Sequence, residues 1–277
     1  MRMATLPYLI KGKNITEKKV SVFALLCLAF VIQMITAWNC YNYGADEYFQ
    51  IIDFASYKLG ITPRSALSWE FAAQIRPSIQ VYIFEYLYRF LAWIGQPDRF
   101  VAISILHIMV GIFGFFVCNY LVIKKFRKEP YLFYVLLLTN FLGIVPYIRA
   151  SFSAEAMGGL MLMLSLLVLE RALELKSSLL WFFLAGVTMG FAVFFRFQVG
   201  FAYVGVAAWL LIFYKHEWKK LMLVFIGLLV SIALNTLLDA SFYGNLCCTP
   251  YNYFFENIIR GRAAAFGVEP WWYYLAI

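Results

Sequence analysis

The sequence predicts an all-α protein that crosses a membrane several times. Of its 277 residues, 64% are hydrophobic and only 14% are charged, whereas about a quarter of the residues of a soluble domain are charged. One soluble core would not hide so much apolar surface, so part of the chain needs lipid as its solvent. The apolar residues also fall into runs close to the ~20 residues that a helix needs to cross a bilayer.

The first apolar run covers residues 20–38 and follows a lysine-rich stretch. It is long for the apolar part of a signal peptide, and bulky residues follow it, so we interpret it as a retained span. Basic residues beside a first span normally stay in the cytoplasm. Residues 1–19 are therefore predicted to be cytoplasmic, and the segment after Trp38 to lie on the outer face, which is lumenal or periplasmic.

Six further runs have near-membrane length: residues 101–123, 131–147, 155–169, 179–195, 199–214 and 221–238. With the first run they predict about seven spans within a membrane module of residues 20–238. Residues 77–95 are also long enough to cross. They carry Glu85 and Arg89, however, and charged side chains are costly at membrane depth.

The distribution of basic clusters decides how residues 77–95 are placed. If this segment crosses, the clusters at 124–128 and 215–220 both fall outside, against the positive-inside rule. If it lies along the interface, both clusters are cytoplasmic, and we predict this arrangement. Four polar segments then share the outer face: residues 39–100, 148–154, 196–198 and 239–277, the last of which leads into the start of a further span.

Charge and cysteine usage exclude other classes of protein. The net charge of +8 comes from lysines and arginines in short loops beside apolar runs, a pattern typical of membrane orientation and not of nucleic-acid binding. Cys27 and Cys118 are predicted to be small buried hydrophobes. Cys40, Cys247 and Cys248 fall in outer segments. A disulfide between Cys40 and either Cys247 or Cys248 is the alternative, but we predict that all three are free thiols. No cysteine or histidine cluster indicates a metal site.

The first outer segment begins with the acidic pair Asp46 and Glu47. From Asp46 onward, apolar side chains recur at helical spacing, while Asp46, Gln50 and Asp53 fall on the opposite side. This pattern predicts a helix that lies in the headgroup plane. Asp46 would stand at its N-terminus, where the helix dipole favours a carboxylate. A plain helix cap is the alternative role for Asp46.

Several strings occur in an order that is similar to a known family: GADEYFQ, LSWEF, IRPS, DASFYGNL, TPYNYFFENI and FGVEPWWYYL. From Asp46 to its last residues, the chain resembles glycosyltransferase family 22, the polyprenyl-phosphate-mannose-dependent mannosyltransferases that build GPI anchors and N-glycan precursors. The resemblance implies a helical bundle of the GT-C type. It also implies transfer of mannose, or another hexose, with inversion to a glycan or glycolipid acceptor on the outer face.

The family pattern also implies a role for Asp46. In the family, the first acid of the pair follows His-Pro and is the residue to which catalysis is assigned, and it matches Asp46. Gly44 and Ala45 stand here in place of His and Pro. This departure indicates a divergent member and favours a bacterial inner membrane, with the endoplasmic reticulum membrane as the alternative.

The implied chemistry needs a carboxylate that takes the proton of the acceptor hydroxyl, and positive charge on the departing phosphate. Asp46 is the first candidate for this general base. Glu47 is the second candidate, or it holds the acceptor in place. Arginine is the best phosphate ligand because its planar fork donates two parallel hydrogen bonds. Arg149, Arg196 and Arg76 are the candidates for binding the phosphate. The alternative for each is an arginine whose side chain only extends to the membrane interface to keep its charge in water.

The remaining candidates for substrate binding are polar residues of the outer segments, namely Glu155, Gln198, Asp239, Tyr243 and Asn257. Glu155 would orient an arginine or contact sugar hydroxyls, or form a buried ion pair. Asn257 offers an amide suited to hydroxyl recognition. The aromatic residues at 271–274 are predicted to belong to an interfacial belt, with sugar stacking as the alternative.

Two other classes of function stay open. In a transporter or flippase for polyprenyl-linked glycans, charged residues such as Glu85, Arg89 and Arg149 would line a pathway, although the apolar runs lack paired Gly/Pro interruptions and an internal repeat. Family members continue through several more spans, so a non-catalytic subunit of a glycan assembly complex is the second alternative. No cofactor is predicted, and the sequence does not decide whether a divalent metal is needed. The expected partners are the lipid-linked donor, the acceptor and membrane lipids.

Overall fold

The computed structural model describes residues 15–40, 44–175, 178–214, 217–270 and 272–273. Most of the predicted cytoplasmic N-terminus, part of the basic cluster at 215–220 and the end of the predicted eighth span lie outside the described residues. Within these ranges every regular element is a helix, and several helices are long and apolar. The structure therefore confirms an all-α membrane protein.

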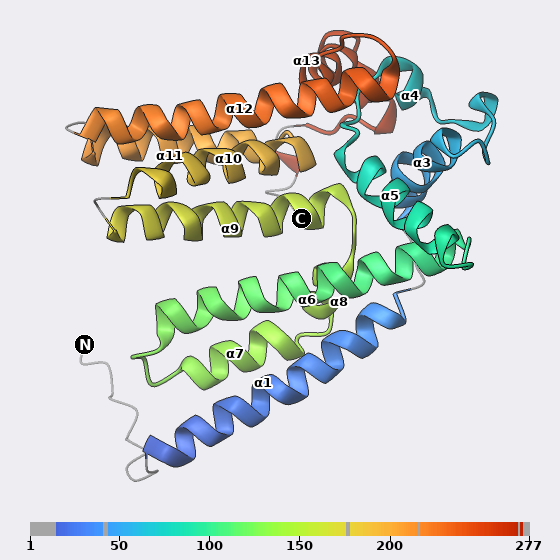
Figure 1. Ribbon diagram of the computed structural model, residues 1–277. Helices are drawn as coiled ribbons and strands as arrows, with labels where there is room; N and C mark the ends of the chain where they lie inside the picture. Colours follow the sequence, from blue (N-terminus) through green and yellow to red (C-terminus); the bar gives the residue numbers. More distant parts are fainter. Residues whose placement is uncertain (1–14, 41–43, 176–177, 215–216, 271, 274–277) are drawn as a thin grey trace.

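The long helices form a bundle. They are α1 (Ile15–Trp38), α6 (Arg99–Phe126), α9 (Ala154–Glu174), α10 (Leu179–Phe195), α11 (Val199–Phe213) and α12 (Trp218–Tyr243). Figure 1 shows them running side by side along one direction, with the chain passing back and forth between the two ends. α1 packs on α6, and α10 packs between α9 and α12.

A cap covers one end of this bundle, and we define it as residues 44–98 and 244–270. Its helices are α2 (Ala45–Glu47), η1 (Tyr48–Ile52), α3 (Asp53–Lys58), η2 (Arg64–Ala66), α4 (Trp69–Ala73), α5 (Ile79–Trp93), α13 (Thr249–Phe254), η4 (Phe255–Ile259) and η5 (Arg262–Phe266). In Figure 1 the cap helices gather at the end where α6 and α9 begin and α12 ends. Segments far apart in the sequence therefore meet there.

Among the residues that the structure describes, four helices are long and apolar enough to cross a membrane: Ser21–Trp38, Arg99–Phe126, Ala154–Glu174 and Trp218–Tyr243. α7 (Leu132–Phe141) and α8 (Ile144–Ala150) pass the same test only as a pair, bent by 65°. α10 and α11 are apolar but shorter. All seven predicted runs are thus helical, while the crossing of all seven stays a prediction.

The break between α7 and α8 was not predicted, because residues 131–147 read as one apolar run. Backbone groups freed by a break at membrane depth must find partners inside the protein. Gln33 of α1 supplies one, since its buried Nε2 donates to the carbonyl of Pro146 at 3.0 Å. Asn119 and Asn140 also hydrogen-bond to each other, at 2.7 and 3.1 Å, and tie α6 to α7.

Small residues bring α10 and α12 into close contact. A Cβ atom placed on Gly186 would collide with the carbonyl oxygen of Val224, and one on Gly227 would collide with that of Phe183. Glycine at such positions lets helix backbones approach closely within a membrane. Ser231 adds a hydrogen bond across the same contact, from its Oγ to the carbonyl of Val187 at 2.8 Å.

The helix predicted from Asp46 is present as the continuous succession α2, η1 and α3. Its polar side was expected to face the headgroups, and for Gln50 and Asp53 that expectation is wrong, because both side chains are buried. α5 packs on this helix, and Arg99 at the start of α6 reaches Ser56 with its Nη1 at 3.1 Å. Burial raises the pKa of the Asp53 carboxyl, and the charge of Arg99 opposes that rise.

α5 lies in the cap and not among the long helices (Figure 1), and the interfacial position of residues 77–95 stays a prediction. Lys124 and Lys125, in the last turn of α6, pair instead with glutamates near the end of α9: Lys125 Nζ lies 2.6 Å from Glu170 Oε1, and Lys124 Nζ lies 2.9 Å from Glu174 Oε1. These basic residues are at the bundle end opposite the cap.

The five cysteines are unpaired, as preferred from the sequence. Cys118 is buried as expected, whereas Cys27 was expected to be buried and is exposed. Burial, together with the neighbouring Asp239 carboxylate, raises the pKa of the Cys247 thiol to about 11. That thiol is therefore protonated at neutral pH and is a poor nucleophile.

The arrangement of cap and basic end predicts a labelling pattern. In a cysteine-free background, a cysteine at Gln96 should react with an impermeant reagent from the outer side, whereas a cysteine at Lys125 should be protected, because basic residues stay cytoplasmic. The measurement is labelling of sealed vesicles before and after permeabilisation. The reverse pattern would mean that residues 77–95 cross the membrane.

Candidate active site

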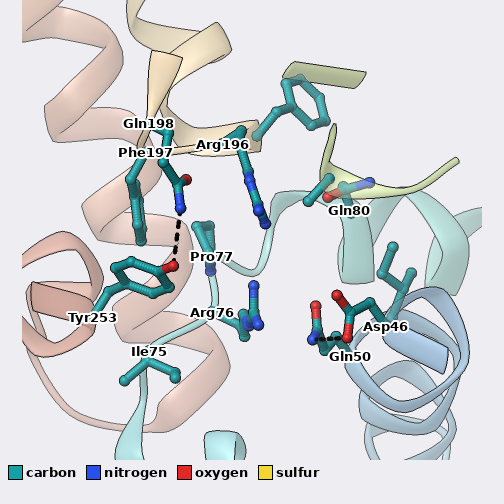
Figure 2. A pocket seen from close by; sticks show the side chains of 13 residues that line it. Asp46, Gln50, Ile75, Arg76, Pro77, Gln80, Arg196, Phe197, Gln198 and Tyr253 are labelled. Carbon is teal, nitrogen blue, oxygen red and sulfur yellow. Dashed lines mark hydrogen bonds between the residues drawn. The ribbon is translucent and has the colours of Figure 1, made fainter. Parts of the chain in front are cut away.

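A narrow cleft lies where the cap meets the bundle, and we call it the arginine cleft. It is lined by Asp46, Gln50, Ile51, Ile75, Arg76, Pro77, Gln80, Ala154, Phe195, Arg196, Phe197, Gln198 and Tyr253. Figure 2 shows the side chains of Asp46, Arg76 and Arg196 converging on its middle. Its free volume is about 30 Å³, which is room for one or two water molecules.

A second, larger cavity adjoins the same acid, and we call it the serine cavity. It has a volume of about 610 Å³ and is lined by Gly44, Ala45, Asp46, Glu47, Tyr147, Ile148, Ser151, Ser153, Glu155 and Ala156. Asp46 is common to the linings of both spaces. The two spaces therefore lie on either side of this residue.

Asp46 owes its position to the first turn of the cap helix. Its backbone lies in α2, and its Oδ1 accepts a hydrogen bond from Gln50 Nε2, one turn later, at 2.8 Å. The residue is exposed, and its side chain points into the cleft (Figure 2). An exposed carboxylate whose orientation is fixed by one hydrogen bond is suited to accept a proton from a bound hydroxyl.

Arg76 is held in the cleft by contacts on several sides. Its Nη2 donates to Glu70 Oε1 at 2.7 Å, and its guanidinium lies 5.9 Å from the ring centroid of Tyr253. Its backbone carbonyl accepts a hydrogen bond from the Tyr243 hydroxyl at 2.7 Å. Tyr243 was predicted to bind substrate, but the structure places it as a support for Arg76.

Asp239 supports the same segment and does not line the cleft. Its buried Oδ1 accepts hydrogen bonds from the backbone N–H and the hydroxyl of Ser78, both at 2.7 Å. Its Oδ2 accepts another from the hydroxyl of Thr249 at 2.7 Å. The carboxylate thus ties the end of α12 to the starts of α5 and α13.

Arg196 enters the cleft from the turn between α10 and α11. Its Nη1 lies 2.6 Å from Glu155 Oε1, and both side chains are partly exposed. A Cβ atom on Gly158 would lie only 2.6 Å from Arg196 Cβ, so this glycine makes room for the arginine stem. Gln198 stands beside it and donates to the Tyr253 hydroxyl at 2.9 Å. The cleft thus joins the predicted residues Asp46, Arg76, Arg196 and Gln198.

Glu47 has a different environment from its neighbour Asp46. It is only 2% exposed, and its Oε1 accepts hydrogen bonds from His107 Nε2 at 2.8 Å and from the backbone N–H of Phe152 at 3.1 Å. The first turn of the cap helix is thereby tied to α6 and to the segment before α9. Glu47 is therefore placed as an anchor of that turn, and not as an open second acid.

Arg149 and Asn257 line neither space. Arg149 is 3% exposed and donates from Nη1 to Asn140 Oδ1 at 3.0 Å, and its guanidinium lies 5.7 Å from the centroid of the Phe115 ring. It belongs to the polar network at the break between α7 and α8. Asn257 Nδ2 donates to the carbonyl of Tyr253 at 3.0 Å. Arg149 is thus directed into the packed protein, whereas Asn257 is half-buried on η4.

The sequence reasoning missed Gln50, Gln80, Tyr253 and His107. Gln80 orients the wall of the cleft, since its Nε2 donates to the carbonyl of Phe152 at 2.6 Å. Of these four residues, His107 could have been found from the sequence, because a histidine inside an apolar run must have a polar partner. Across the described parts of the chain, no group of three or more histidines, cysteines, aspartates and glutamates is placed to hold a metal ion.

Fold and site together define an all-α integral membrane protein whose polar cavities lie where a helical cap meets one end of the bundle. The chain belongs to the Alg9-like mannosyltransferase family, whose sequence profile matches residues 22–277. This confirms the resemblance noted in the sequence.

Two relatives carry the same name. GPI mannosyltransferase 3 of Candida albicans is 24% identical over 92% of this chain and 52% of its own length. GPI mannosyltransferase 3 of Debaryomyces hansenii is 23% identical over 96% of this chain and 49% of its own length. The chain thus spans about half the length of the curated relatives it matches. No solved structure matches it.

The environments of the two acids predict opposite responses to amide substitution. Glu47→Gln should lower the free energy of unfolding by about 2 kcal/mol, because it weakens charged hydrogen bonds to His107 and Phe152 in a buried site. Asp46→Asn is the matched control and should leave it unchanged. The measurement is thermal unfolding of the purified protein in detergent. Equal midpoints for the two variants would contradict the anchoring role of Glu47.

Proposed function

We propose that the chain carries the active site of an inverting mannosyltransferase that uses a polyprenyl phosphate donor. The observation that carries the proposal is the convergence of an open carboxylate, Asp46, with two guanidinium groups, Arg76 and Arg196, on one cleft. Membership of a mannosyltransferase family supports the sugar. We propose a glycan or glycolipid as the acceptor, the class that the names of the two yeast relatives suggest.

In the proposed reaction the acceptor hydroxyl attacks C1 of the mannosyl group and its proton passes to the Asp46 carboxylate. The bond between C1 and the phosphate oxygen breaks, and its electron pair stays on the departing polyprenyl phosphate. Arginine side chains would stabilise this added negative charge by charge-assisted hydrogen bonds. Since attack and departure occur on opposite faces of C1, the configuration at C1 is inverted.

The two arginines differ in how they would meet a phosphate. Arg76 is fixed by Glu70 and by the Tyr243 hydroxyl. Arg196 is held by Glu155 at a partly exposed ion pair, which is a weak interaction in water. Because the cleft is narrow, we propose that the donor phosphate takes the place of Glu155 at Arg196 as it binds.

We propose that the cap faces the lumen or periplasm. The support is that the cap stands at the bundle end opposite Lys124 and Lys125, and basic residues mark the cytoplasmic side. Lipid-linked sugar in the outer leaflet would then lie at the depth of the cleft. The endoplasmic reticulum membrane fits the yeast relatives, and a bacterial inner membrane is the alternative.

The direct test is transfer of labelled mannose from a short-chain polyprenyl phosphate to glycolipids, beside a sugar-nucleotide donor. The proposal expects transfer from the lipid-linked donor alone. Activity only with the nucleotide would contradict it. Movement of the donor across vesicle membranes without transfer would instead indicate a transporter.

Asp46→Asn should lower turnover by about 10²-fold or more, the usual effect of losing a general base. The amide keeps the shape and can still contact Gln50, so folding and membrane insertion should not change. Turnover is measured at saturating donor and acceptor, with the amount of inserted protein as the control. Full activity in this variant would leave Asp46 as an acidic residue of the first helical turn, where Gly44 and not Asp46 is the N-cap.

Arg196→Lys and Arg149→Lys should separate phosphate binding from packing. At a phosphate site lysine keeps the charge but loses the fork, so Arg196→Lys should depress turnover more than donor affinity, with unchanged stability. Arg149→Lys should instead lower the unfolding midpoint, because Arg149 is buried against Asn140 and Phe115. Loss of turnover in Arg149→Lys at unchanged stability would return that residue to the site.

A further inference from the structure

The serine cavity is the larger of the two spaces that Asp46 lines, and the reaction described above does not yet use it. Its volume of about 610 Å³ lies in the range of small-molecule sites, whereas the arginine cleft has room for little more than a phosphoryl oxygen. Asp46 borders both. The cavity is therefore placed to hold a sugar against the same carboxylate.

The charges around the cavity differ from those of the cleft. Arg76 and Arg196 line the cleft, whereas the acidic residues Asp46, Glu47 and Glu155 line the cavity. The Glu47 side chain is directed toward His107, whereas Asp46 is exposed, and Glu155 loses its partner Arg196 once the donor phosphate takes its place there, as proposed above. A phosphate or a sugar acid would be repelled by these two groups. A neutral ligand would meet no such penalty.

The wall of the cavity offers hydroxyl groups in fixed positions. Ser151 Oγ accepts a hydrogen bond from the backbone N–H of Ser153 at 3.2 Å, and Ser153 Oγ accepts one from the N–H of Ala156 at 3.3 Å. Each serine oxygen is thus oriented by the backbone and keeps its own proton for donation. Serine hydroxyls combined with the acceptor oxygens of Glu155 suit a polyhydroxyl ligand.

Gly44 and Ala45, just before Asp46, also line the cavity. A Cβ atom on Gly44 would touch nothing within 4 Å. The backbone there has φ −55° and ψ 144°, which any residue adopts without strain. The absence of a side chain at Gly44 is therefore not needed for folding, and its effect is to keep this side of the cavity open.

We propose that the serine cavity is the acceptor subsite, that it takes an uncharged, hydroxyl-rich sugar, and that Gly44 and Ala45 set its width. The inference rests on the proposed function. If the leaving phosphate lies at the arginines and C1 is attacked from the opposite face, the acceptor must enter from the other space that Asp46 borders. The acceptor hydroxyl then lies within reach of the base, and Ser151 and Ser153 bind its neighbouring hydroxyls.

Gly44→Leu tests the width of the cavity, and Gly143→Leu is the matched control. Gly143 is also exposed, with φ −49° and open space around its Cβ position, but it lines neither space. With glycolipids of yeast microsomes as acceptor, Gly44→Leu should raise the acceptor KM by about tenfold or more, as misplaced methylene groups do in a binding pocket. The donor KM should stay within about twofold, and Gly143→Leu should change neither value. An unchanged acceptor KM, or a raised donor KM, would overturn the inference.

A second measurement needs no turnover, and so separates this inference from the proposed function. All five native cysteines are replaced by alanine, Gly44→Cys is introduced, and the new thiol is labelled with a maleimide. Octyl α-mannoside should slow labelling at concentrations about tenfold lower than its 6-phosphate, as expected for ~1.4 kcal/mol of charge repulsion. Equal protection by both glycosides, or by neither, would overturn the subsite. Protection without mannosyl transfer by the wild-type chain would overturn only the proposed function.

Discussion

The buried carboxylate of Asp239 is the contact on which the cap depends. It is 1% exposed and receives three hydrogen bonds, two from Ser78 and one from Thr249. An ionised group in such a place is tolerated only when its acceptor positions are filled. Since Ser78 begins α5 and Thr249 begins α13, one side chain at the end of α12 fixes two separate parts of the cap.

This contact reaches the candidate site through the backbone. Tyr243 lies one turn after Asp239 on α12 and holds the carbonyl of Arg76, two residues before Ser78. The guanidinium of Arg76 therefore projects from a segment clamped at both of these points. A similar division holds on the other side of the cleft, where Glu47 anchors the turn and leaves Asp46 open.

The apolar runs predicted the helices, and the positive-inside rule predicted which polar segments would meet at one end. The amino-acid sequence alone was therefore enough to group Asp46, Arg76, Arg196 and Gln198. It was not enough to assign the role of each polar residue, because that role depends on the direction of a side chain and on partners distant in sequence. Glu47 and Asp46 are adjacent, yet a rotation of about 100° per residue directs one toward His107 and the other toward the cleft.

Arg149 illustrates the same limit at the break between α7 and α8. The sequence placed Arg149 correctly at the end of an apolar run. The run, however, bends by 65°, and this bend directs the end of α8 into the bundle. Nothing in the local sequence indicates that Asn140 and Phe115 would receive the guanidinium. The break itself depends on Gln33, which lies more than a hundred residues earlier and donates to Pro146.

The π-helical turn η1 (Tyr48–Ile52) has a consequence for how this helix tolerates changes in length. A π turn holds one residue more than an α turn, and such turns often occur at functional sites. The π turn accommodates this extra residue between Asp46, which faces the cleft, and Phe54, which is fully buried in the core. Deleting one residue from η1 would therefore leave an α turn and keep the direction of Asp46 relative to Phe54. Deleting one residue from an α-helical turn would instead rotate everything before it by about 100°.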